Sequence, residues 1–265
     1  MMNHLLQGLL AAFMLLPCGM LKAQEASVPT PIFLDQAQPD IFPKSWLTPR
    51  INAKAEPLPE NQRLRTLHLL QHAISKYPAA VLKDNLHKVH LLGRLEYSGV
   101  PTGGTNSRTV VYVVNNGEAR YTDHAIEGIF HAEFSSILLR NHSQHLGKDQ
   151  WQQLNPLGFT YLGTGGVNAI KQQKASLKPD AVMHADGFLH QYAKADFEDD
   201  FNSMAARLMQ GDAELWRLMA EYPKLQAKAT LVMNFYHKLD PSFTRARFQS
   251  FCSPAQEGAK KQARP

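Results

Sequence analysis

The sequence predicts an α+β domain in which a short sheet is covered by helices, and three observations support this fold class. Apolar residues recur at helical spacing in "ENQRLRTLHLLQHAISKYP". Two strand-like runs follow, "HKVHLLGRLEY" and the β-branched "RTVVYVVN". The rest of the chain is dominated by helical patterns, with a long central segment and a helical C-terminal third.

Each element has its own signals along the chain. Pro78 ends the first helix, and the two strands are separated by "SGVPTGGTNS", a Gly/Pro/Ser sequence expected to be a loop. The next helix is expected over residues 123–141, with Thr122 or Asp123 as its N-cap. Residues 142–187 contain many turn signals. Three further helices are expected to stop at Gly211, at Pro223 and before Asp240-Pro241.

The first 23 residues look like an export signal. Their apolar stretch, Leu5 to Leu16, is too short to span a bilayer comfortably, and cleavage is expected after Ala23. Cys18 would allow lipid attachment, but Pro17 replaces the small residue usually found before a lipidated cysteine. We therefore expect a periplasmic or extracellular protein that is attached to a membrane only if Cys18 is lipidated.

The remaining chain divides into three parts. Residues 24–58 are rich in proline and are expected to form an extended lead-in on the surface rather than an independent domain. Residues 59–252 form the α+β domain, and residues 253–265, which include the basic run "AKKQARP", are expected to be a disordered tail. The structural domain is therefore predicted to be single.

Composition narrows the function classes. The formal net charge is +5, but lysines and arginines are scattered instead of forming a stripe, which argues against nucleic-acid binding. If Cys18 leaves with the signal, Cys252 is the only cysteine of the mature chain, so no intramolecular disulfide can form. No phosphate-binding loop, dinucleotide fingerprint or nucleophile elbow is found by inspection.

The central helix has the outline of a zinc-protease helix. In such a helix two histidines at i and i+4 bind zinc, and the glutamate after the first polarises the zinc-bound water. Here "FHAEFSSILL" keeps the glutamate as Glu133 but has Ala132 and Ser136 at the two histidine positions. A methyl group cannot bind zinc, and a neutral hydroxyl is a poor ligand beside imidazole and carboxylate.

Several segments together resemble a family of predicted zinc-binding metallopeptidases of the bacterial cell envelope, over about residues 58–245. The central helix, the two strands, "DGFLHQYAKADFEDDFNSMAARLM" and "KATLVMNFYHKL" follow that family's order. The resemblance implies a zincin-like fold, with Glu133 as a vestigial acid/base and His131 and Tyr192 as cleft residues. It also places the third metal-ligand position at Ser203, so all three ligand positions are degenerate.

Three functions stay open at this stage. The preferred one is a catalytically inactive, exported protein that has no cofactor and binds a peptide or protein partner in the envelope. The second is an active metal-dependent peptidase that uses Glu133 as general base and binds zinc through a rebuilt site. Its ligands would come from histidines such as His124, His131, His142, His145, His184 or His190, together with Glu127. The third is a structural or interaction protein that shares only the fold.

Overall fold

The computed structural model describes residues 32–34, 37, 39–163 and 165–252. The expected export signal at 1–23 and the expected tail at 253–265 lie outside these residues. Within the described part, no helix has both the length and the apolar character needed to cross a bilayer.

The sheet is built around β3 (Lys88–Tyr97), which pairs along both of its edges. The sheet order is β1-β3-β6-β5, with β1 and β6 parallel to β3, while β2 and β4 pair with β3 in the antiparallel sense. The other strands are β1 (Ile32–Leu34), β2 (Lys54–Pro57), β4 (Val100–Pro101), β5 (Gly104–Asn106) and β6 (Val110–Val114). β5 pairs antiparallel with β6 at the end of this order.

Two segments contribute more to this sheet than the sequence indicated. The expected Gly/Pro/Ser loop at 98–107 forms β4 and β5 instead. The described part of the lead-in supplies β1 and β2, and its residues Phe42, Ala53 and Leu58 are buried in the core. Both segments are short and rich in Gly or Pro, so their pairing depends on the neighbouring strands rather than on their own propensity.

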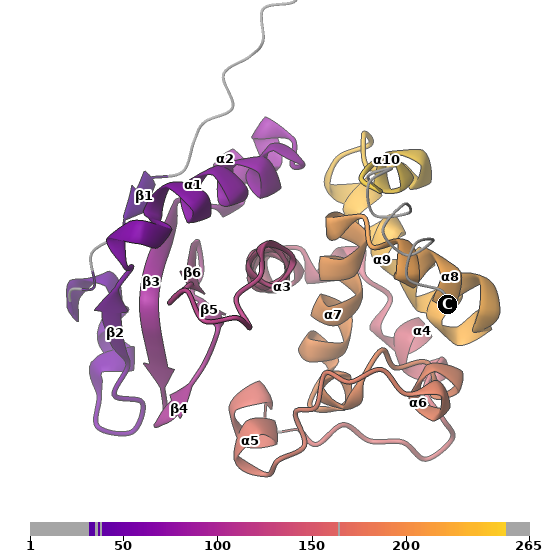
Figure 1. Cartoon of the computed structure of the whole chain (residues 1–265). Coiled ribbons are helices and arrows are strands. Elements are labelled where there is room, and N and C mark those ends of the chain that lie inside the picture. Colours follow the sequence, from indigo (N-terminus) through magenta and orange to yellow (C-terminus); the bar gives the residue numbers. More distant parts are fainter. Residues whose placement is uncertain (1–31, 35–36, 38, 164, 253–265) are drawn as a thin grey trace, which may run out of the picture.

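The long helix α3 (Asp123–Asn141) lies between the sheet and the C-terminal helices, as Figure 1 shows. The Thr122 hydroxyl caps its first turn by accepting a hydrogen bond from the Ala125 amide at 3.1 Å. Phe130 and Phe134 have no exposed surface, and burial of each phenyl ring stabilises the fold by about 1.5–3 kcal/mol. These contacts hold α3 in one position against its neighbours.

A close approach between α3 and β5 requires glycine at position 104. A Cβ atom there would lie 2.5 Å from Ile129 Cγ2 and 3.2 Å from Glu133 Cγ. Any larger residue would separate the strand from the helix, so Gly104 brings β5 next to Glu133.

The remaining helices follow the predicted order with additional short pieces. α1 (Glu60–Ser75) and α2 (Ala79–Asn85) are separated at Pro78 as expected. The helical C-terminal third consists of α7 (Phe197–Gln210), α8 (Ala213–Glu221), α9 (Pro223–Leu239) and the unanticipated α10 (Arg245–Ser250). The middle contains α4 (Lys148–Gln153), α5 (Gly165–Lys171) and α6 (Ala181–Asp186). The described residues also contain four short 3₁₀ helices: η1 (Pro39–Ile41), η2 (Lys44–Leu47), η3 (Ser143–His145) and η4 (Gln191–Lys194).

Candidate functional site

Glu133 projects from α3 toward β5 and makes its hydrogen bond with a side-chain amide. Asn106 Nδ2 donates to Glu133 Oε2 at 2.6 Å. Arg140 reaches Asn106 Oδ1 and donates to Glu198 Oε1 at 2.9 Å. The Arg140 guanidinium therefore contacts Asn106 and Glu198.

The electrostatic environment of Glu133 favours its neutral form. Burial raises the pKa of Glu133 to about 7, and the charge of Glu198 acts in the same direction. The hydrogen bond from Asn106 and the charge of Arg140 lower this pKa, but they do not outweigh burial. Glu133 therefore changes charge near neutral pH, which is the range in which a carboxyl group can exchange protons.

A second carboxyl group and a phenol interact electrostatically with Glu133. Burial and then the charge of Asp196 raise the pKa of Asp199 to about 8, and Glu133 adds to this shift. Burial and the charges of Asp199 and Glu133 also raise the pKa of Tyr192 above its usual range. Within the described residues, Asp199 Oδ2 is buried without a hydrogen-bond partner. The predicted cleft residue Tyr192 is thus near Glu133, whereas His131 is not part of this group.

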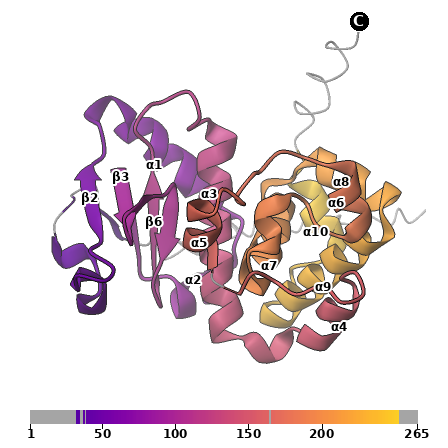
Figure 2. The same cartoon turned by 90° about the horizontal axis from the view of Figure 1, so that it is seen from below.

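Tyr192 lies against the backbone of α5. A Cβ atom at Gly166 would lie 1.9 Å from the Tyr192 hydroxyl oxygen, so only glycine fits there. α5 comes from the irregular middle of the chain, and in Figure 2 it lies in front of α3. This segment therefore covers one side of the Tyr192 hydroxyl.

Ser136, one of the two positions where the resemblance implied histidine, lies where α3 meets α7. Ser136 Oγ accepts a hydrogen bond from Asn202 Nδ2 at 2.5 Å, and Ser135 Oγ donates to Asn202 Oδ1 at 2.7 Å. Asn202 is 8% exposed, Ser136 is 3% exposed and Ser135 is fully buried. One carboxamide therefore uses both of its polar ends to join α7 to two consecutive serines of α3.

Ser203, the residue that the resemblance assigned to the third ligand position, has a different role. Its Oγ donates to the Asp199 carbonyl at 2.6 Å, which is a contact within α7. The structure places Asn202, one residue earlier, against Ser136. The α7 residue that hydrogen-bonds to Ser136 is therefore Asn202, which the sequence did not single out.

These residues do not fit a catalytic zinc ion. Zinc in proteins is held by thiolate, imidazole or carboxylate groups. Ala132 offers no donor atom, and the hydroxyls of Ser136 and Ser203 already participate in protein hydrogen bonds. Glu133 therefore has no neighbouring set of ligands at the three positions that the resemblance implied.

The histidines considered for a rebuilt site are spread among separate hydrogen bonds. His131 Nδ1 shares a hydrogen bond with the Tyr77 hydroxyl at 2.8 Å, and its Nε2 lies 3.4 Å from Glu127 Oε1. Other partners are Gln210 for His124, Asn85 for His142, the Leu189 carbonyl for His184 and the Ala193 amide for His190. No group of three or more His, Cys, Asp or Glu side chains arranged for a metal ion occurs among the described residues.

The three consecutive acidic residues Glu198, Asp199 and Asp200 have different surroundings. Glu198 pairs with Arg140, while Asp200 pairs with Lys228 at 2.7 Å in a fully buried contact. The cap of α7 is Asp196, whose carboxylate accepts from the Asp199 amide at 2.8 Å. The acidic run therefore lies in the first turn of α7, and its side chains do not converge on one cation.

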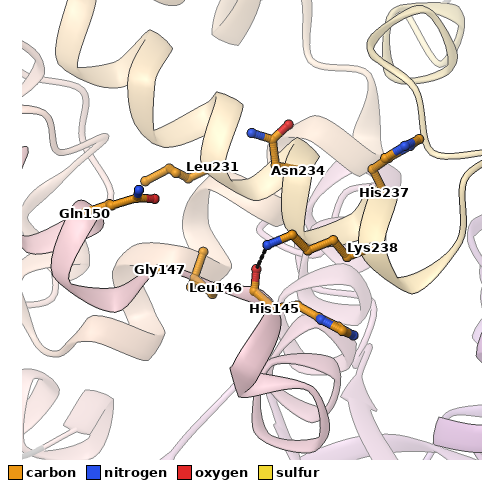
Figure 3. A pocket seen from close by; sticks show the side chains of 8 residues that line it. All are labelled: His145, Leu146, Gly147, Gln150, Leu231, Asn234, His237 and Lys238. Atoms are coloured by element: carbon orange, nitrogen blue, oxygen red, sulfur yellow. Dashed lines mark hydrogen bonds between the residues drawn. The ribbon is translucent and has the colours of Figure 1, made fainter.

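A separate hollow of about 200 Å³ lies on another part of the surface, between α9 and the chain around α4. Figure 3 shows His145, Gln150, Asn234, His237 and Lys238 among its lining residues. Lys238 Nζ donates to the His145 carbonyl at 3.1 Å, and none of the lining residues belongs to the Glu133 group. The hollow supplies no carboxylate for acid–base chemistry.

Sequence reasoning identified Glu133 and Tyr192 but not the groups that determine their environment. Asn106 lies in the expected loop, and nothing in that loop indicated a strand beside the helix. Asn202 precedes Ser203, the position assigned by the resemblance. A helical wheel of α7 placed against α3 could have indicated that Asn202 faces α3. No local pattern indicated that Asp199 would interact with Glu133 of α3.

Comparisons with known proteins give little beyond this geometry. No protein-family model matches the chain, and no curated protein matches it. A solved structure from Bacteroides caccae, described as "a putative zinc-binding metallo-peptidase", is similar with a TM-score of 0.46. It shares 14% sequence identity, and the match covers 74% of this chain and 78% of that chain. At this distance the likeness assigns neither family nor activity.

Proposed function

We propose that the protein is exported, does not act as a zinc peptidase, and uses the surface beside Glu133 to bind an extended peptide or protein segment. The observation that carries this proposal is the Ser135–Asn202–Ser136 contact. It occupies with hydrogen bonds the helix face where the two histidines would have to converge. The retained Glu133 then belongs to a polar surface without a metal to activate water.

The open edge of β5 supports a role in peptide binding. The strand β6 pairs with β3 on one edge and with β5 on the other, so β6 itself has no edge available for a peptide. Gly103 and Ser107 make their backbone hydrogen bonds with β6. By the alternation of an antiparallel pair, Gly104 and Asn106 direct their backbone groups away from β6. The Gly104 carbonyl accepts from the Thr102 hydroxyl at 2.9 Å, and an extended peptide could pair with the Gly104 N–H and the backbone groups of Asn106.

Metal content and peptide cleavage test the inactive state. Protein purified without chelator is analysed for zinc, and wild type and Glu133→Gln are incubated with a peptide mixture, with and without added zinc. We expect zinc far below one equivalent per chain and no cleavage above background in either protein. One equivalent of zinc, or cleavage that disappears in Glu133→Gln, would overturn the proposal.

Peptide retention tests the binding role separately. Asn106→Pro removes one outward N–H group of β5, whereas Thr105→Ala shortens a side chain and leaves all backbone donors in place. We expect peptides to be retained by the wild type and Thr105→Ala but not by Asn106→Pro, with melting temperature recorded for each. Equal retention by a folded Asn106→Pro protein would rule out binding at this edge.

A second candidate function is a metal-independent or unconventional hydrolase that uses Glu133 as general base. It is favoured by one observation, the pKa of Glu133 near 7, which suits proton transfer at neutral pH. Such an enzyme would lose cleavage in Glu133→Gln, and its wild type would cleave equally with and without added zinc. The cleavage experiment therefore separates the two functions.

A further inference from the structure

Exposed apolar side chains are concentrated in one segment of the chain. Seven large hydrophobic residues are exposed among the described residues, and five of them lie in residues 157–182. These are Leu157, Leu162, Ile170, Leu177 and Val182, and three of the five are at least two-thirds exposed. A cluster of this kind is unusual for a surface that contacts only water.

The same segment is positively charged. Residues 150–179 contain Lys171, Lys174 and Lys178 but no aspartate or glutamate. All three lysines are exposed. The next acidic residue, Asp180, uses its carboxylate to cap α6 by accepting hydrogen bonds from the Val182 and Met183 amides. Within residues 157–182 the three lysines are therefore opposed by one carboxylate, that of Asp180, and the segment has a formal charge of +2.

This segment lies along one side of the molecule. In Figures 1 and 2, α5 and the chain leading to α6 are on the lower side of the domain as oriented in Figure 1. The backbone of this stretch, which carries Ile170, Leu177 and the three lysines, therefore lies along that side. We call the described residues of 157–182 the basic apolar segment.

We propose that the basic apolar segment docks the protein on an anionic lipid surface. Apolar side chains that enter the interface and lysines that contact anionic headgroups are the two components of peripheral membrane binding. The apolar residues are spread over loops and two short helices, an arrangement that a fluid bilayer accommodates without the shape complementarity that a protein partner needs. A second copy of the chain is disfavoured because a symmetric contact would bring six lysines together.

This docking is separate from the peptide-binding role and requires no lipid on Cys18. It would hold the domain through α5, the helix that contacts Tyr192, and so would place the Glu133 group close to the membrane. The binding strength should fall with added salt, since exposed charges are screened over about 10 Å at 0.1 M ionic strength.

Hydrogen exchange of the full chain gives a local test. Exchange is measured with vesicles of phosphatidylglycerol and phosphatidylcholine, with vesicles of phosphatidylcholine alone, and without lipid. We expect slower exchange across residues 157–182 with the anionic vesicles only. Unchanged exchange in this segment would overturn the proposal, whatever the N-terminal residues do.

Matched lysine variants test the charge contribution by co-sedimentation with the anionic vesicles. Replacing Lys171, Lys174 and Lys178 by Gln should weaken partitioning about a hundredfold, from three lysines at an anionic surface. The control replaces Lys54, Lys83 and Lys88, which are exposed on β2, α2 and β3, and removes the same formal charge. Equal loss in both triple variants would show a net-charge effect and contradict a docking segment.

Apolar variants complete the test. Leu157→Ser with Leu177→Ser should weaken partitioning by more than about tenfold, because both side chains would leave the interface. Leu64→Ser changes a side chain that is 69% exposed on α1 and should have no effect. All of these sites are at the surface, so unchanged melting temperatures are expected. Retained partitioning of the double variant would overturn the apolar part of the proposal.

Discussion

Two carboxylates on α3, Glu127 and Glu133, lie less than two turns apart and have opposite environments. Glu127 accepts from Lys76 Nζ at 2.5 Å and lies 3.4 Å from His131 Nε2. Glu133 accepts from the neutral amide of Asn106. One carboxylate therefore has a cation in contact with it, and the other has an amide.

The two groups accordingly have pKa values on opposite sides of the usual range. Burial by itself would raise the pKa of Glu127, but hydrogen bonds and charge from His131 and Lys76 lower it to about 2. Burial lowers the pKa of His131 to about 4, so this imidazole is neutral at pH 7 and Lys76 supplies the positive charge. Glu133 has no such cation, and its pKa rises to about 7.

The difference teaches which carboxylate serves the fold. Glu127 and Lys76 join α3 to the end of α1, and Lys76 also donates to the Met209 carbonyl of α7 at 2.9 Å. This contact fixes three helices and stays charged across the physiological range. Burial of Glu133 is unfavourable, and Glu133 makes no comparable contact that joins helices. A carboxylate with a strongly shifted pKa is typical of a functional site.

The largest expected effect comes from removing the cation beside Glu127. Lys76→Met keeps the apolar packing but leaves a buried carboxylate with no positive partner, so the free energy of unfolding should fall by about 3–5 kcal/mol. Urea denaturation at pH 7 measures the change. Arg94→Met, which disrupts an exposed pair with Glu56, should cost no more than about 1 kcal/mol. Similar losses in both variants would contradict the distinction.

How far the sequence predicts this molecule depends on the distance over which each signal acts. Local signals succeeded: Thr122 caps α3, Pro78 separates α1 from α2, and Gly211 ends α7 in a left-handed conformation. Each of these signals depends on residues within about one helical turn of each other in the sequence. The sequence also placed Glu133 and the degenerate Ala132 and Ser136 on one long helix.

The failures are contacts between distant segments. Asn106 meets Glu133 only because β5 forms and because Gly104 permits the close approach. Asn202 contacts Ser136 because α7 is rotated about its axis so that Asn202, and not Ser203, faces α3. The family resemblance assigned this position to Ser203, one residue later. Lys76 and Glu127 are 51 residues apart and carried no pairing signal. Tertiary packing decides these contacts.

A cation placed beside Glu133 should give this carboxylate the positive partner that Glu127 already has. Ala132→His, Ser136→His and Asn202→Glu together create three zinc-ligand groups on the facing sides of α3 and α7. At a free zinc concentration one hundred times the dissociation constant, binding should stabilise the folded chain by about 2.7 kcal/mol. Thermal melting with and without zinc measures this, with the wild type as the control.

The position on α7 can be tested with the same pair of histidines. Ser203→Glu in place of Asn202→Glu should give a smaller zinc-dependent shift, because Ser203 contacts its own helix rather than Ser136. A larger shift with Ser203→Glu would support the position taken from the family resemblance. No shift in either triple variant would contradict a zincin-like arrangement of α3 and α7.

The next effect is a pH dependence that should differ between the two carboxylates. The folded pKa of Glu133, about 7, lies above the usual value of 4.5, so the folded protein binds the extra proton between these values. Stability therefore falls as pH rises through this window. Glu133→Gln should match the wild type at pH 5 and exceed it at pH 8 by on the order of 2 kcal/mol.

Glu127→Gln is the matched control for this profile. The folded pKa of Glu127 is depressed to about 2, so its contribution is lost only as pH falls below about 4.5. Its substitution should lower stability by the same amount at pH 5 and pH 8. Because Glu133 and Asp199 influence each other, the Glu133 profile reports the pair. A flat difference between Glu133→Gln and wild type would show that Glu133 is charged throughout.

The smallest effect tests whether the Asn106 amide is the main counterpart of Glu133. This hydrogen bond lowers the pKa of Glu133, so Asn106→Ala should move the titration of Glu133 to higher pH. It should also reduce stability at pH 8 by about 1 kcal/mol, and by less at pH 5, where the carboxyl is protonated. Asn116→Ala removes an equivalent amide contact to the exposed Glu118 and should change neither quantity. Carboxyl NMR across the pH range distinguishes the two variants, and an unmoved Glu133 midpoint in Asn106→Ala would mean that solvent replaces the amide, so that burial alone determines the charge of this group.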